Sequence, residues 1–152
     1  MRNLTIIFAL IGFLAYPFVN VQAQEVKGDD ILGVWLNEDK DAHVEVYKEG
    51  EIYFGKIIWL EEPNEENGEA KLDDENEDES LRTRPVMGLL LLRDFVFDED
   101  EWEDGRIYDP KNGKDYKCYM EFPDEDDKDN LKVRGYIGFS LLGRTTYWTR
   151  VK

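Results

Sequence analysis

The feature that most constrains the fold is a series of short runs rich in Val, Ile, Tyr, Phe and Trp, separated by Gly, Asp, Asn and Pro. The clearest run is DYKCYMEF at 115–122, in which Tyr116, Cys118 and Met120 alternate with polar residues. Successive side chains of a strand point to opposite faces, so this alternation predicts a strand with one buried face. The segment LKVRGYIGF at 131–139 has the same period.

Eight runs of this kind predict eight strands, over residues 31–37, 42–48, 51–60, 86–97, 102–109, 114–122, 130–139 and 144–151. The apolar run at 86–92 also fits a buried helical turn, because periodicity does not separate the two in so short a stretch. No long amphipathic helix and no internal repeat is evident. Short strands with mostly tight connections predict an all-β fold, either an antiparallel barrel or a sandwich.

The first 23 residues, MRNLTIIFALIGFLAYPFVNVQA, have the pattern of a secretory signal peptide. Arg2 precedes a mostly apolar stretch, and Val21 and Ala23 are the small residues expected before a cleavage site. A transmembrane anchor is the weaker interpretation, because the stretch is short and no basic cluster follows it. We therefore expect an exported protein, periplasmic or secreted, whose residues 24–152 form a single domain.

The balance of charge excludes some classes of partner. The chain has 19 basic and 35 acidic residues and a formal net charge of −16. Nucleic acids and anionic membrane surfaces bind proteins through cationic patches, so we expect neither as a partner. Cys118 is the only cysteine, so the chain has no intrachain disulfide, and its apolar surroundings predict a buried thiol.

Residues 61–81 are strongly acidic, too polar to pack alone and too long for a plain hairpin. They predict either a lid-like loop or a disordered segment, and their composition favours disorder. Arg82 and Arg84 follow, two residues apart and therefore on one face of an extended chain. In an up-and-down barrel alternate connections meet at the same end, which predicts one rim that carries Lys40, Arg82, Arg84, Lys111, Lys114 and Arg144.

Several motifs resemble one known family. GVW at 33–35 resembles the Gly-x-Trp start of lipocalin-like (calycin) barrels. The remaining motifs are similar to those of the DUF2147 family of exported bacterial proteins. The matching residues are Arg82, Arg84, Pro85, Gly88 and Leu89; Trp102, Gly105, Ile107, Tyr108, Asp109, Pro110, Gly113, Lys114 and Tyr116; Arg134, Gly135, Tyr136 and Gly138; and Leu142, Gly143, Arg144, Trp148 and Arg150.

The resemblance covers residues 33–151 and implies an eight-stranded antiparallel up-and-down lipocalin-like barrel. It also implies that Trp35 lies at the closed end of this barrel, stacked under Arg150. A cation–π contact of that kind is worth roughly 0.5–2 kcal/mol and is structural. The family has no established activity. The main departure of this sequence from the family pattern is its long acidic loop at residues 61–81.

The candidate ligand-binding residues are three arginines and three aromatic residues. Arg82, Arg84 and Arg144 could hold an anionic group at the open rim, since guanidinium binds carboxylate or phosphate in a bidentate manner. Alternatively, they pair with the nearby acids Asp73, Asp74, Glu77 or Glu79 and fix the loop. The aromatic candidates for a pocket are Trp102, Tyr108 and Tyr116, although most aromatic residues in strands serve packing.

Neither a metal site nor a catalytic group is evident. His43 is the only histidine and alternates with outward-facing residues, so it is a poor axial ligand for haem. The acidic run that starts at Asp74 lacks the glycine and the final glutamate of a calcium loop. No nucleophile, base and orienting group can be named together. We therefore expect no cofactor, no metal and no enzymatic activity.

Two functions remain open from the sequence. The first is an exported, non-enzymatic binding protein that holds a small apolar or amphipathic ligand near the arginine rim. This ligand could carry an anionic group. The second is a packed-barrel interaction protein of the bacterial cell envelope, without a small-molecule ligand, which would be favoured by an exposed apolar patch of several hundred Å².

Overall fold

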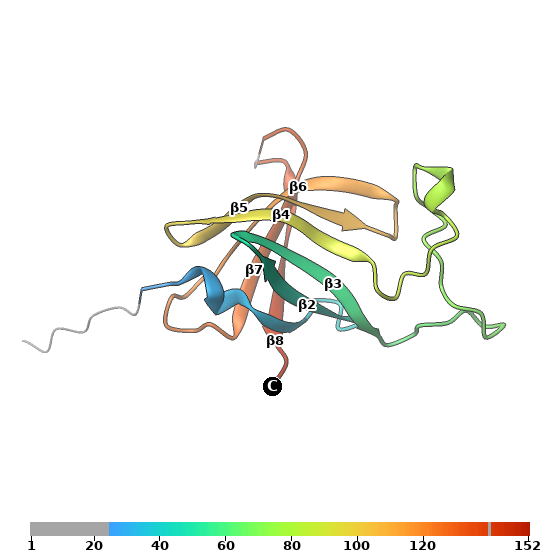
Figure 1. Cartoon of the computed structure of the whole chain (residues 1–152), viewed down its shortest axis with the longest axis horizontal. Coiled ribbons are helices and arrows are strands. Elements are labelled where there is room, and N and C mark those ends of the chain that lie inside the picture. Colours follow the sequence, from blue (N-terminus) through green and yellow to red (C-terminus); the bar gives the residue numbers. More distant parts are fainter. Residues whose placement is uncertain (1–24, 140) are drawn as a thin grey trace, which may run out of the picture.

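The computed structural model describes residues 25–139 and 141–152 (Figure 1), and the predicted signal peptide lies outside this range. The described residues form a closed barrel in which each strand pairs antiparallel with the next and β8 returns to β1. The eight strands are β1 (Gly33–Leu36), β2 (Ala42–Glu49), β3 (Ile52–Leu60), β4 (Leu90–Asp98), β5 (Glu101–Asp109), β6 (Lys114–Glu121), β7 (Asn130–Tyr136) and β8 (Gly143–Arg150). The prediction of an eight-stranded up-and-down barrel is confirmed.

Three predicted strands are clearly shorter in the structure. The strand predicted over 31–37 is limited to Gly33–Leu36, because Ile31 is the last residue of a 3₁₀ helix, and glycine explains the other two differences. Residues 86–89 form a turn before β4, in which Gly88 has φ +89° and donates its N–H to the carbonyl of Ile57. β7 ends at Tyr136, because Gly138 has φ +70° and the chain turns back there. Positive φ is accessible to glycine at little cost, and it ends an extended strand.

Side chains fill the interior of the barrel. The inward positions of the alternating runs are buried, as the pattern of β6 predicts for Cys118 and Met120. The largest fully buried apolar side chains are Trp35, Trp102, Phe95, Ile31, Leu92, Met120, Leu131, Val44 and Val133. An eight-stranded barrel is just wide enough for its own side chains, so this core leaves the ends as the places where function can reside.

One end of the barrel is closed by a short 3₁₀ helix, η1 (Gly28–Ile31). Two indole groups hold η1 in place, since Nε1 of Trp35 donates to the carbonyl of Ile31 at 2.8 Å and Nε1 of Trp102 donates to that of Gly28 at 3.1 Å. Both indoles are fully buried. Their N–H groups therefore find partners in the backbone of η1, as buried tryptophan requires.

Arg150 connects this closed end to the seam of the barrel. It is the register partner of Trp35 across β1 and β8, and its guanidinium carbon lies 4.2 Å from the centre of a Trp35 ring. The guanidinium also donates to three backbone carbonyls, those of Asp30 (2.6 Å), Leu32 (2.9 Å) and Lys128 (2.9 and 3.1 Å). One side chain thus joins η1, the start of β1 and the loop before β7.

Replacement of Arg150 should destabilise the whole barrel. We expect Arg150→Ala to lower the free energy of unfolding by about 2–4 kcal/mol, because it removes a cation–π contact and the donors of several poorly hydrated carbonyls. Arg144→Ala is the control, since Arg144 is exposed and its nearest carboxylates are 3.8 Å away; it should cost less than about 0.5 kcal/mol. Urea unfolding followed by tryptophan fluorescence measures both, and equal losses would contradict this role.

Candidate functional site

The acidic segment between β3 and β4 lies at the other end of the barrel and has a defined course, which differs from the disorder that its composition favours. Two isolated bridges pair Asn64 with Ala70 and Leu72 with Pro85. A 3₁₀ turn, η2 (Glu79–Leu81), begins after Asp78, whose side chain accepts from the N–H of Ser80. In Figure 1 this segment projects away from the barrel before it returns to β4.

A buried carboxylate holds the returning half of the segment. Asp73 is fully buried, and both of its oxygens are occupied. Oδ2 accepts from Nε and from a terminal nitrogen of Arg84 at 2.8 and 2.7 Å, and from Nδ2 of Asn76 at 2.8 Å. Oδ1 accepts from the hydroxyl of Tyr108 on β5. A carboxylate removed from water needs such partners, because an unpaired buried charge costs several kcal/mol.

Tyr108 is the link between the segment and the barrel. Its hydroxyl donates to Asp73 and accepts from Nδ2 of Asn76 at 2.8 Å, while the guanidinium of Arg84 lies 5.5 Å from the centre of its ring. Burial of the ring, followed by the hydrogen bond to Asp73 and the charge of that carboxylate, raises the pKa of Tyr108 to about 12. The phenol is therefore neutral at physiological pH, and its hydroxyl donates a hydrogen bond to Asp73.

The turn between β5 and β6 packs against the same segment. Gly113 has φ +71°, and a Cβ at this position would lie 1.8 Å from the carbonyl oxygen of Glu75. Only glycine permits this contact, both for its conformation and for its space. The glycine of the DPKNGK turn thus allows the acidic segment to approach β5 and β6 closely enough for Asp73 to reach Tyr108.

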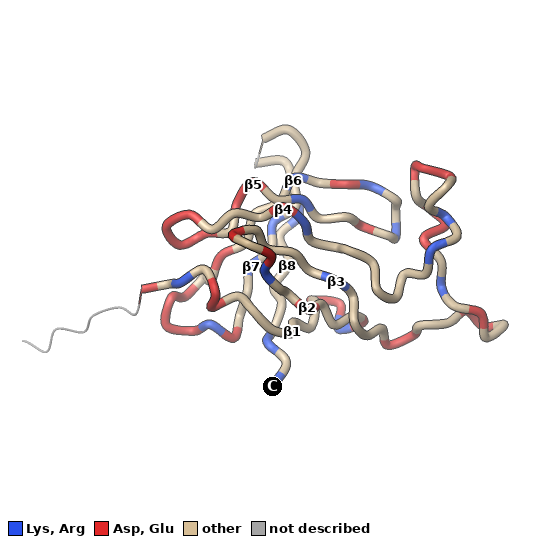
Figure 2. Tube along the Cα trace, viewed as in Figure 1, with Lys and Arg blue, Asp and Glu red and all other residues tan. Residues whose placement is uncertain are grey.

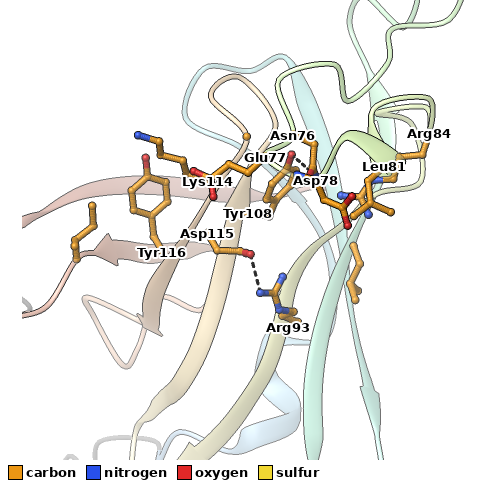
Figure 3. Close-up of a pocket in the computed structure, with 13 residues that line it drawn as sticks. Asn76, Glu77, Asp78, Leu81, Arg84, Arg93, Tyr108, Lys114, Asp115 and Tyr116 are labelled. Carbon is orange, nitrogen blue, oxygen red and sulfur yellow. Dashed lines mark hydrogen bonds and ion pairs between the residues drawn. The ribbon is translucent and has the colours of Figure 1, made fainter.

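These contacts leave a cleft of about 510 Å³ at the rim, which we call the mouth cleft (Figure 3). The acidic segment forms one wall and β4–β6 form the other, and Ile137, which follows β7, also lines the cleft. Its apolar lining comes from Leu81, Leu90, Tyr116 and Ile137. Its remaining lining residues are Asn76, Glu77, Asp78, Arg84, Arg93, Tyr108, Gly113, Lys114 and Asp115.

The three cations of the mouth cleft differ in their partners. Arg84 is paired with Asp73, and Arg93 is paired with Asp115 at 2.9 Å, as drawn in Figure 3. Within residues 25–139 and 141–152, Lys114 is exposed and its ammonium group has no carboxylate partner. Lys114 is therefore the cation that is available to a ligand in this cleft.

The structure brings together three of the six predicted ligand-binding residues, since Arg84, Tyr108 and Tyr116 all line the mouth cleft. Arg82 lies beside them and donates from Nε to the carbonyl of Asn76 at 2.7 Å, with Glu79 at 3.8 Å. Arg82 and Arg84 thus contact acids of the loop, as in the alternative that the sequence left open. Their role toward a ligand stays a prediction.

Arg144 and Trp102 lie apart from the mouth cleft. Arg144 is on the same rim but faces Glu38 and Asp39 at 3.8 Å. Trp102 is fully buried at the closed end, where it packs against Phe97 and Phe122 with ring centres 5.1 and 5.2 Å apart. Trp102 was a candidate for a ligand pocket, but as the second residue of β5 it lies at the opposite end of that strand from Tyr108 and forms part of the core.

Sequence reasoning missed the residues that organise the site. Asp73 and Asn76 were not distinguished from the many acids and amides around them, because burial depends on which part of the loop meets β5. Leu81, Leu90 and Arg93 were not predicted to line a cleft. Lys114 was predicted on the rim, but its freedom from carboxylates, in contrast to Lys111 with Asp39 and Asp41 at 3.2 and 3.0 Å, had no sequence signal.

The described part of the chain contains no group of three His, Cys, Asp or Glu side chains that could hold a metal ion. Cys118 is a free, buried thiol, and burial raises the pKa of this group well above its ordinary value. Across residues 25–139 and 141–152, no helix is long and apolar enough to cross a membrane.

Comparison with known proteins agrees with the barrel and the motifs. The model of the family described as "Uncharacterized protein conserved in bacteria (DUF2147)" matches residues 33–150. No curated protein matches the sequence significantly. A solved structure of protein HP1028 from the human pathogen Helicobacter pylori, described as belonging to the lipocalin family, is similar with a TM-score of 0.69 and 19% identity, over 80% of this chain and 83% of that one. At this identity the similarity concerns the fold alone.

Loss of the Asp73 carboxylate should release the acidic segment. We expect Asp73→Ala to lower the free energy of unfolding by about 3 kcal/mol, because Arg84 and the hydroxyl of Tyr108 lose their acceptor in a buried setting. Asp74→Ala is the matched control, since Asp74 is exposed, and it should cost less than about 0.5 kcal/mol. Hydrogen exchange should rise across residues 71–86 in the first variant only; unchanged exchange there would contradict the assignment.

The environment of Tyr108 should be visible in an alkaline titration. The difference in absorbance at 295 nm between the wild type and Tyr108→Phe should titrate near pH 12, whereas the ordinary value for a tyrosine side chain is about 10. Because the folded-state pKa is raised, the contribution of Tyr108 to stability is complete below about pH 10 and is lost as the pH rises toward 12. Titration of Tyr108 near pH 10 would contradict a buried hydrogen bond to Asp73.

Proposed function

The chain belongs to the DUF2147 family, and from this membership, the barrel and the geometry of the rim we propose that it is an exported, non-enzymatic protein that binds a small amphipathic molecule in the mouth cleft. A lipocalin-like barrel is compatible with ligand binding but does not specify a ligand. The choice among possible sites and ligand classes therefore depends on the chemistry of the residues.

The location of the proposed site follows from packing. Phe95, Leu92 and Met120 are fully buried within the barrel, so a ligand that occupies the interior, as a lipid tail would, has to displace core side chains. A second and smaller cleft, of about 330 Å³, lies near η1; of its two lysines, Lys48 is paired with Asp29 at 3.1 Å and Glu51 at 3.3 Å, and Lys27 is exposed. The mouth cleft combines open space with an available cation.

The observation that carries the proposal is the position of Lys114 next to apolar side chains. Lys114 lines the same cleft as Leu81, Leu90 and Tyr116, and it has no carboxylate partner within the described residues, although acids outnumber bases almost two to one in the chain. A molecule with a carboxylate, sulfonate or phosphate next to an apolar body would satisfy both features. Arg84 and Arg93 would add to the positive electrostatic potential at the anion of the ligand while they remain bound to Asp73 and Asp115.

The first experiment is to recover the protein as the cell makes it. The full chain is expressed with residues 1–23, purified from the envelope fraction, and weighed by native mass spectrometry before and after organic extraction. A discrete extra mass that is lost on extraction supports the binding function. An apo mass, together with no binding of dodecanoate or 1-anilinonaphthalene-8-sulfonate, would overturn it in favour of the envelope interaction protein.

A pair of lysine variants tests the site directly. Lys114→Gln should weaken the binding of dodecanoate and 1-anilinonaphthalene-8-sulfonate by about fivefold to tenfold, because it removes a charge-assisted contact worth about 1 kcal/mol. Lys111→Gln, three residues away but paired with Asp39 and Asp41, should leave the affinity within about twofold. Titration calorimetry measures both variants; equal effects would show that the probes respond only to net charge.

A further inference from the structure

The connection between β7 and β8 exposes an unusual amount of apolar surface. Ile137, Phe139, Leu141 and Leu142 are 66%, 80%, 87% and 70% exposed, whereas the other exposed large hydrophobic residues of the described chain lie between 37% and 51%. We call these four residues the apolar cluster. Figure 2 shows their connection as a loop without charge at the top of the view, while other connections carry several acids.

The backbone around the apolar cluster is held in a tight turn. The N–H of Ile137 donates to the carbonyl of Leu142 at 3.1 Å, and the N–H of Leu142 donates to that of Phe139 at 3.0 Å. Gly138 has φ +70°, and a Cβ on Gly143 would meet the carbonyl oxygen of Gly135 at 2.3 Å. These bonds satisfy backbone groups internally, which is a condition for entering an apolar phase.

Cations lie at the base of this turn. Lys117 on β6 is the register partner of Tyr136, the last residue of β7, and Arg106 on β5 is the register partner of Lys117. Each is exposed, and the buried Gly105 and Cys118 next to them face the interior. Like charges directly opposite in a sheet are destabilising, yet neither cation has a carboxylate partner within the described residues. Arg144 follows the cluster on β8 and is 72% exposed.

We propose that the apolar cluster inserts into the surface of a phospholipid bilayer, with Arg106, Lys117 and Arg144 directed to the lipid phosphates. The apolar cluster consists of only four side chains, whereas a stable protein interface covers about 800 Å² on each partner. A lipid surface therefore fits the cluster better than a protein partner does. Phosphate would supply the anion that Arg106 and Lys117 lack.

The net charge of −16 overstates the repulsion between this face of the protein and an anionic bilayer. Salt limits the reach of exposed charges to about 8–10 Å, so the groups nearest the bilayer decide the interaction. The segment from Ile137 to Gly143 contains no acid, and neither Arg106 nor Lys117 has a carboxylate partner within the described residues. Arg144 contributes less, because the carboxylates of Glu38 and Asp39 lie 3.8 Å from it. The expectation that anionic membranes are excluded as partners therefore applies to the average charge and not to this face.

Flotation with vesicles tests the proposal. With vesicles of phosphatidylethanolamine and phosphatidylglycerol (3:1), the wild type should bind, and Phe139→Ser/Leu141→Ser should bind at least tenfold more weakly, because two large apolar side chains lose their burial in lipid. Val96→Ser is the matched control, an exposed apolar residue of β4 outside the cluster, and should bind like the wild type. Arg106→Gln/Lys117→Gln should reduce binding severalfold and flatten its dependence on salt.

A site-specific label identifies the inserted residues. Leu141→Cys can be labelled with a nitrobenzoxadiazole dye because the native Cys118 is buried. On vesicle addition its emission should shift to shorter wavelength and be quenched by nitroxide-labelled lipid, whereas the same dye on Val96→Cys should not respond. A label at 141 that stays in water would overturn the proposal.

Further outcomes distinguish this proposal from its rivals. Lys114→Gln should retain vesicle binding, since Lys114 is neither in the apolar cluster nor among the cations proposed to face the lipid; loss of binding in this variant would show capture of lipid by the mouth cleft instead of insertion. A wild type that ignores vesicles but forms dimers, and loses them in Phe139→Ser/Leu141→Ser, would overturn insertion in favour of a contact between copies. Sedimentation velocity measures the dimer.

Discussion

The closed end of the barrel depends on the guanidinium of Arg150. β1 and β8 share only two register pairs, Trp35 with Arg150 and Leu36 with Thr149, so the seam has few backbone contacts of its own. Arg150 adds a cation–π contact with Trp35 and donors for the carbonyls of Asp30, Leu32 and Lys128. Five donors in a planar fork can serve several acceptors at once, which a lysine cannot do. Closure of the barrel in turn fixes which connections meet at each end.

The open end of the barrel is organised by a buried anion, whereas the closed end is organised by the cation Arg150. Asp73 is removed from water and receives hydrogen bonds from Arg84, Asn76 and Tyr108, which belong to different parts of the chain. Such a network contributes less to net stability than apolar packing would, but it penalises every arrangement in which a partner is missing. It therefore gives a defined course to a segment whose composition would otherwise favour disorder. The mouth cleft exists because this segment is held beside β5 and β6.

Charge is distributed unevenly over the rim, and the distribution separates two surfaces. In the mouth cleft the arginines are paired and Lys114 is available beside apolar side chains. The segment from Ile137 to Gly143 contains no acid, and its apolar cluster is exposed next to Arg106 and Lys117. A net charge of −16 describes neither surface, because screening makes local groups decisive.

The sequence by itself determined the strands and their alternation, since a period of two and a glycine in a turn are local properties of the chain. Its local pattern left barrel and sandwich open, and the resemblance to a family implied the barrel. The same resemblance also indicated that Trp35 belongs with Arg150. Only the tertiary structure decided that Asp73 is buried while Asp74 is exposed, and that Lys111 is paired while Lys114 is available. These neighbours have nearly the same local sequence, and their differences arise from segments that meet only when the barrel has closed.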